Sequence, residues 1–179
     1  MNLFWSTRML TEEKEDHLTE FLAAALHASE NFRTAYAKHV LTDYAKARNW
    51  DAPEIESVKT QVRFPETEYC PAMVITLTDG KTIICEHKFD APVTMASEQE
   101  QRARLKQYLN LSVDGLIYFR ITRKPPCSDV IKHEKYIYPD NREHFLWEDL
   151  YPLLSSDDHV LLEWLKEGFE WLGFTPVDI

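Results

Sequence analysis

An acid and a lysine lie two residues apart at the end of a predicted β-hairpin, in the sequence Glu86-His87-Lys88. Successive residues of a strand point to opposite faces, so Glu86 and Lys88 share one face and His87 points to the other. A carboxylate can bind Mg²⁺, and the backbone carbonyl of Cys85 is a candidate for a second oxygen ligand. A lysine about 7 Å along the same strand can position the attacking water. These residue types could serve metal-dependent hydrolysis of a phosphodiester.

The other strand of this hairpin ends in an alanine where a second acid would complete the site. Thr78-Asp79-Gly80 is predicted to form a three-residue loop, with Gly80 in the left-handed conformation. This loop sets a register in which Ala72 falls opposite Glu86. Alanine has no side-chain oxygen to offer a metal ion, so the predicted metal site lacks one carboxylate.

Taken alone, an acid and a lysine near a strand end are a weak signal, because charged residues are common at such positions. The longer pattern around them resembles the PD-(D/E)XK nuclease superfamily. The resemblance rests on Pro71-Ala72, Glu86-His87-Lys88 and the continuation Phe89-Asp90-Ala91-Pro92. It extends over about residues 11–122 through several further features: Glu15 and Thr19 on an N-terminal helix, Leu105 and Tyr108 on a later helix, and the strand sequence Val113-Asp114-Gly115-Leu116-Ile117-Tyr118.

The resemblance implies a restriction-endonuclease-like core, a Mg²⁺ or Mn²⁺ cofactor, and DNA as the expected substrate. The continuation after Lys88 is similar to that of bacterial members of restriction-like and antiviral defence type. Glu86 would be a metal ligand, Lys88 the cation beside the water, and Ala72 the vacated ligand position. An acid on the N-terminal helix often approaches the metal in this superfamily, so Glu15 is a candidate ligand. The alternative for Glu15 is a first-turn acid that the helix dipole favours.

Two residues depart from the superfamily pattern. Ala72 replaces the metal-binding aspartate, which predicts loss of the metal site and of most cleavage in this chain. Arg104 replaces a helix glutamine, with Gln101 and Gln107 nearby, and these three are the candidate contacts to nucleic acid. Either the chain is a degenerate member of the superfamily or it is an inactivated variant of an active enzyme. The intact Glu86 and Lys88 favour the second interpretation.

The predicted elements alternate in a way that favours an α/β fold. Helices are expected over residues 11–29, 30–48, 97–109, 145–154 and 157–172. Strands are expected over residues 55–64, 73–78, 81–88 and 113–121, with a short one near 130 or at 136–138. The order predicts a small mixed β-sheet flanked by helices on both faces. We expect a single nuclease-like domain over 1–179, with its core motif in 54–122 and a helical C-terminal region in 140–179.

Composition limits the partners and the compartment. The net charge of −10 argues against a protein held on nucleic acid by bulk electrostatics, but leaves room for a local basic groove. Two basic clusters, Arg102 to Lys106 and Arg120 to Lys124, are alternatively ordinary solvated faces. No apolar run approaches the length of a membrane span. The three cysteines show neither disulfide nor zinc spacing, so a cytoplasmic location is expected.

A second copy of this chain and another protein are two further expected partners. A symmetric homodimer would place two active sites on the two strands of a duplex. Aromatic residues are dense near the C-terminus, where helical spacing favours core packing and a protein-interaction surface is the alternative: Phe145, Trp147, Tyr151, Trp164, Phe169, Trp171 and Phe174. The rival to a nuclease is a non-catalytic protein with the same fold that binds nucleic acid or another protein.

Overall fold

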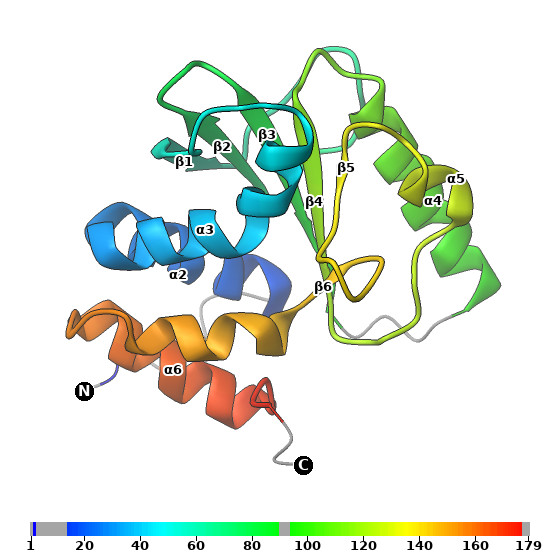
Figure 1. Cartoon of the computed structure of the whole chain (residues 1–179). Coiled ribbons are helices and arrows are strands. Elements are labelled where there is room, and N and C mark those ends of the chain that lie inside the picture. Colours follow the sequence, from blue (N-terminus) through cyan, green and yellow to red (C-terminus); the bar gives the residue numbers. More distant parts are fainter. Residues whose placement is uncertain (1, 3–13, 90–93, 177–179) are drawn as a thin grey trace.

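The computed structural model describes residues 2, 14–89 and 94–176 of this 179-residue chain. A mixed six-stranded sheet lies at its centre, with helices before, between and after the strands (Figure 1). The helices are α2 (Lys14–Ala28), α3 (Glu30–Ala47), α4 (Met95–Leu109), α5 (Ser128–Ile131), the 3₁₀ helix η1 (Trp147–Ser155) and α6 (Val160–Leu172). The strands are β1 (Ile55–Thr60), β2 (Met73–Leu77), β3 (Thr82–His87), β4 (Gly115–Arg120), β5 (Tyr136–Ile137) and β6 (Phe145–Leu146).

The sheet combines an antiparallel half and a parallel half. Strands β1, β2 and β3 form an antiparallel meander, and α4 then carries the chain across to β4, which is parallel to β3. The short strands β5 and β6 pair one after the other along β4, both parallel to it. An antiparallel pair needs only a tight turn, whereas a parallel pair needs a long crossover, so α4 must lie between β3 and β4.

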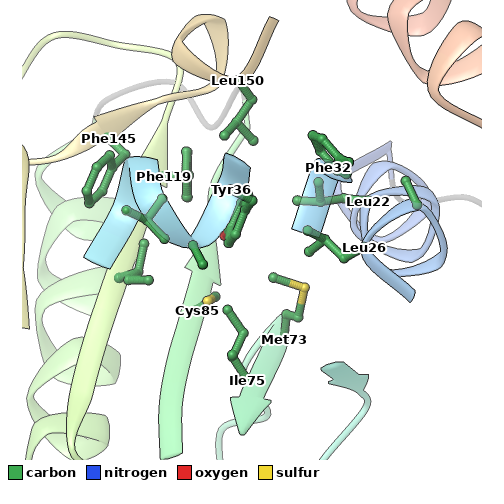
Figure 2. Close-up of a cluster of buried hydrophobic side chains, with 14 of the residues drawn as sticks. Leu22, Leu26, Phe32, Tyr36, Met73, Ile75, Cys85, Phe119, Phe145 and Leu150 are labelled. Carbon is green, nitrogen blue, oxygen red and sulfur yellow. The ribbon is translucent and has the colours of Figure 1, made fainter. Parts of the chain in front are cut away.

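Helices cover both faces of the sheet, as the order of elements predicted. Helices α2, α3, η1 and α6 lie on one face and α4 and α5 on the other (Figure 1). On the first face, residues of β2, β3 and β4 pack against Leu22, Leu26, Phe32, Tyr36 and Leu150 of the helices (Figure 2). On the second face, Leu105 and Tyr108 of α4 pack against Ile84 and Tyr118. The sheet therefore separates two buried hydrophobic clusters.

Two glycines lie where a larger residue would be unfavourable. Gly80 has a φ of 86°, the left-handed conformation that the predicted hairpin loop requires. Gly115 begins β4, and a Cβ there would lie 2.5 Å from Cδ1 of Ile137, so the Ile137 side chain would have to shift.

Several predicted boundaries are wrong, each for a local reason. The first strand ends at Thr60 and not at 64, because Gln61 turns the chain with a φ of 57°. Val130 lies in the short helix α5, so the short strand is the one at Tyr136–Ile137. The helix expected over 145–154 begins as strand β6 and continues as a 3₁₀ helix containing Pro152. The last helix begins at Val160, where the side chain of His159 accepts a hydrogen bond from the backbone of Leu161.

Across the part of the chain that the structure describes, no helix has the length and apolar character needed to cross a bilayer.

Candidate functional site

The hairpin register brings Ala72 and Glu86 to the same end of neighbouring strands. Met73 pairs with Cys85, so one residue further along Ala72 faces Glu86, as the sequence predicts. The turn has the predicted form, with the backbone N–H of Leu77 donating to the carbonyl of Lys81 at 2.8 Å. Asp79 lies in this turn, at the opposite end of the hairpin from Glu86. Asp79 therefore cannot be the second acid that the sequence analysis looked for beside Glu86, and the residue opposite Glu86 is Ala72.

Glu86 is buried on the α4 face, where it carries an ion pair. Glu86 is only 1% exposed, and its Oε1 accepts a hydrogen bond from Nη1 of Arg104 at 3.0 Å. Burial raises the pKa of the Glu86 carboxyl to about 7, although Arg104 and the nearby backbone of Ala72 act in the opposite direction. Because burial disfavours the charged form of this carboxyl, a positive partner such as Arg104 stabilises the carboxylate.

Lys88 and Glu15 meet at the same end of β3. The Nζ of Lys88 lies 4.0 Å from Oε2 of Glu15, and the same oxygen accepts a hydrogen bond from the backbone N–H of Phe89 at 2.8 Å. Burial raises the pKa of Glu15, while the Phe89 hydrogen bond and Lys88 oppose that rise. The structure thus brings together Glu15, Glu86, Lys88 and Arg104, which we call the charged cluster.

Polar atoms without partners surround Glu86. Near Glu86, five buried side-chain atoms have no hydrogen-bond partner among the residues that the structure describes: Oε2 of Glu86, Nε of Arg104, Nε2 of Gln101 and the hydroxyls of Tyr108 and Tyr118. Burial raises the pKa of Tyr118. The charge of Arg120 opposes this rise, and the charge of Glu86 adds to it to a smaller extent. The Tyr118 hydroxyl therefore stays protonated. Buried polar atoms in native proteins normally have partners, so these atoms make the surroundings of Glu86 a candidate site for a polar ligand or water.

Cys85 does not join the charged cluster through its side chain. The thiol is fully buried on the α2 and α3 side of the sheet, close to Tyr36, and burial raises its pKa to about 12. Hydrogen-bonded pairs alternate along an antiparallel ladder. Counting from the bonded pair Leu77 and Lys81, the pair Met73 and Cys85 is also a bonded one. The carbonyl of Cys85 therefore points toward β2 and not toward a metal beside Glu86.

The residues as written do not fit a Mg²⁺ or Mn²⁺ site. In residues 14–89 and 94–176, no group of three or more histidine, cysteine, aspartate or glutamate side chains could hold a metal ion. Glu15 and Glu86 supply two carboxylates, and each is already beside a cation. Magnesium in enzymes is usually held by one or two carboxylates together with water and substrate phosphate. Glu15 and Glu86 would therefore have to exchange their cation partners for the metal ion.

Ala72 is half-buried and borders a hollow of about 190 Å³, with Thr19, Gln61, Cys70 and Pro71 among its other walls. Two acidic residues of α2, Asp16 and Glu20, also line this hollow.

The candidate contacts to nucleic acid have different surroundings. Gln101 is 8% exposed and faces the sheet from α4, as Arg104 does. Gln107 lies to the side, where its Oε1 accepts a hydrogen bond from the hydroxyl of Thr67 in the β1–β2 connection. The pairing of Arg104 with Glu86 was not predicted. A signal was present, because residue 104 follows buried Gln101 by three positions and precedes buried Tyr108 by four, which places it on the same helix face.

Ion pairs neutralise most of the two basic clusters. Acidic side chains lie within 4 Å of five of their six basic residues: Arg102 and Lys106 with Asp129, Arg104 with Glu86, Arg120 with Glu98, and Arg123 with Glu148. A phosphate backbone is attracted by unneutralised lysine and arginine. A nucleic acid that bound here would have to compete with these acids.

The aromatic C-terminal residues mostly serve the core. Trp147, Phe145, Phe169 and Phe174 are buried, and their rings pack with His87, Phe89 and Phe119. Of the seven aromatic residues named above, Trp171 alone is classed as exposed, at 58%. Core packing, the first of the two predicted interpretations, therefore accounts for most of this group.

Comparison with other proteins adds no relative: no family model, no curated protein and no solved structure matches this chain. The interpretation of the charged cluster consequently rests on its own geometry and on the motif around Glu86.

Proposed function

We propose that this chain has the fold of a PD-(D/E)XK nuclease and is inactive as written, because Ala72 stands where a metal-binding aspartate is needed. The observation that carries the proposal is the register of β2 and β3, which puts Ala72 directly opposite Glu86. Glu15 and Lys88 lie beside the same strand end. A helix-flanked mixed sheet with an acid, a lysine and a vacant position at one strand end supports this assignment better than any other site in the described residues.

The roles proposed for the side chains follow from their positions. Glu86 and an aspartate at 72 would hold Mg²⁺ or Mn²⁺ with oxygens from neighbouring strands, and Glu15 would add a third carboxylate from α2. Lys88, on the face of Glu86, would position the attacking water. Since two carboxylates with cation partners do not make a metal site, the chain as written has no cleavage step. DNA is the proposed substrate, with Gln101, Arg104 and Gln107 on α4 as proposed contacts.

A non-catalytic role on the same fold is the second candidate. The ion pairs of Arg102, Lys106 and Arg120 with acidic neighbours favour it, because they leave little free positive charge for a nucleic acid. Such a protein would bind a partner with the fold intact and would need no metal.

The test is to introduce the missing acid. Purified Ala72→Asp, Ala72→Asn and unaltered chains are incubated with linear and circular DNA and with RNA, each with Mg²⁺ or Mn²⁺. We expect cleavage from Ala72→Asp only, because asparagine has nearly the same size as aspartate but no charge. Adding Glu86→Gln to Ala72→Asp should abolish the cleavage.

Circular dichroism of every variant shows whether the fold is retained. Folded Ala72→Asp protein that cleaves none of these substrates with either metal, and that shows no thermal shift with Mn²⁺, would leave the non-catalytic role as the better explanation.

A further inference from the structure

Arg104 is the cation nearest to the carboxylate around which the proposed metal site is arranged. Its Nη1 donates to Oε1 of Glu86 at 3.0 Å, and the Glu86 side chain is almost completely buried while that of Arg104 is 26% exposed. A buried carboxylate strongly needs a positive partner, and here the partner comes from the chain itself. The position that a metal ion would take beside Glu86 is next to this guanidinium.

The guanidinium is held from three sides. Glu100, one turn earlier on α4, lies 3.6 Å from Nη2, and the ring of Tyr69 lies under the guanidinium with its centroid 5.0 Å from Cζ. With Glu86 as the third contact, Arg104 is fixed by an acid on its own helix, an acid on β3 and an aromatic ring of the β1–β2 connection. These three contacts fix the position of the planar guanidinium beside Glu86.

One oxygen of Glu86 is bound to Arg104, and the other has no partner among the described residues. A divalent ion that bound Oε2 would lie within a few ångströms of the guanidinium charge. Like charges that close repel each other strongly in a buried site. A metal ion and Arg104 in its present position are therefore competitors for the same carboxylate.

We infer that Arg104 acts as the resident cation of this site, neutralising Glu86 in place of a divalent metal, so that metal binding requires Arg104 to move away. The inference rests on the proposed function and goes beyond it. It predicts that restoring an acid at position 72 leaves a site that binds metal weakly, and that removing the positive charge at 104 makes the binding tight. Arg104 would be a residue that sets metal affinity, acting through Glu86.

The experiment measures Mn²⁺ affinity and does not depend on activity. Isothermal titration and the electron paramagnetic resonance of free Mn²⁺ give the Kd for Ala72→Asp alone and combined with Arg104→Gln, Arg104→Lys or Lys106→Gln. We expect Arg104→Gln to tighten binding by about tenfold or more, the usual size of the effect of one nearby charge on a carboxyl. Arg104→Lys keeps the charge and should stay closer to the Ala72→Asp parent.

Lys106→Gln is the matched control. It removes one positive charge from the same helix, but Lys106 pairs with Asp129 at 3.1 Å and is about half exposed. Its Kd for Mn²⁺ should stay within about twofold of the parent because exposed charges are screened by water and salt.

The Kd values test the inference about Arg104 and the proposed function separately. Equal Mn²⁺ affinity with and without Arg104→Gln would overturn the inference and leave the proposed function standing. Failure of both proteins to bind Mn²⁺ would overturn the proposed function, and the inference with it. If Arg104→Gln does not fold, Arg104→Met keeps the aliphatic stem on Tyr69 and removes the same charge, so the same comparison of Kd values applies.

Discussion

Glu86 and His87 are neighbours at the end of β3, yet they face two differently built sides of the sheet. His87 is fully buried among the rings of Phe119 and Trp147, and its Nδ1 hydrogen-bonds the hydroxyl of Thr19 at 2.7 Å. Glu86 faces α4, where an arginine and several partnerless polar atoms surround it. The α2 side is packed mainly with rings and aliphatic side chains, although Nε2 of His87 and the hydroxyl of Tyr36 have no hydrogen-bond partner among the described residues, whereas the α4 side holds a buried ion pair.

The difference shows which face stabilises the fold and which face is available for chemistry. Buried rings contribute stability through the apolar area that they remove from water. Buried charges contribute little stability, since removing them from water costs as much as their pairing returns. The buried carboxylate and its arginine on the α4 face therefore add little stability there, and buried ionisable groups of this kind are candidates for function.

The largest effect should come from the aromatic core on the His87 side. Trp147→Ala removes a fully buried ring that contacts His87, Phe119 and Phe169, and should lower the free energy of unfolding by about 3–5 kcal/mol. Chemical denaturation followed by fluorescence measures it. Trp171→Ala, at an exposed position of α6, is the control and should change stability by about 0.5 kcal/mol or less. Equal losses in both variants would contradict the assignment of Trp147 to the core.

The charge on Glu86 should make the protein less stable as pH rises. The folded chain keeps the Glu86 proton up to a pKa of about 7, while the unfolded chain releases it near 4.5. Between these values the folded state binds more protons, so stability falls with rising pH. Relative to Glu86→Gln, the unaltered chain should lose about 3 kcal/mol between pH 4.5 and 8. Denaturation curves of the two proteins at both pH values test this, and parallel pH profiles would contradict the raised pKa.

His87 should have the opposite dependence. Burial lowers its pKa from 6.5 to about 3, so the folded chain holds it neutral while the unfolded chain takes up a proton below pH 6.5. Its contribution to stability is present above pH 6.5 and is lost as the pH falls toward 3. His87→Asn, which can keep a polar atom near Thr19, should remove about 2–3 kcal/mol of the acid destabilisation between pH 6.5 and 4.5. The readout is the difference between the two unfolding free energies at each pH, and a constant difference would show that His87 does not titrate in this range.

Much of the hairpin was predictable because its determinants are local. Residue alternation and the Asp79-Gly80 turn specify the register, and from the register follow Ala72 opposite Glu86 and His87 on the other face. The order of elements likewise predicted a mixed sheet with helices on both sides. Boundaries were less predictable where a single backbone conformation decides them, as at Gln61, or where a short segment changes type, as at Phe145.

Residue types and the hairpin register specify which charged side chains stand at the strand end and that an alanine lies opposite Glu86. How those charges are satisfied depends on the packing of elements that are distant in the sequence. The pairing of Arg104 with Glu86 joins α4 to β3, and the contact of Thr19 with His87 joins α2 to β3. Helical spacing places Arg104 on the inner face of α4 but does not identify the partner of either residue. The partners come from separate elements, whose relative positions are set by the packing of two hydrophobic clusters against the sheet.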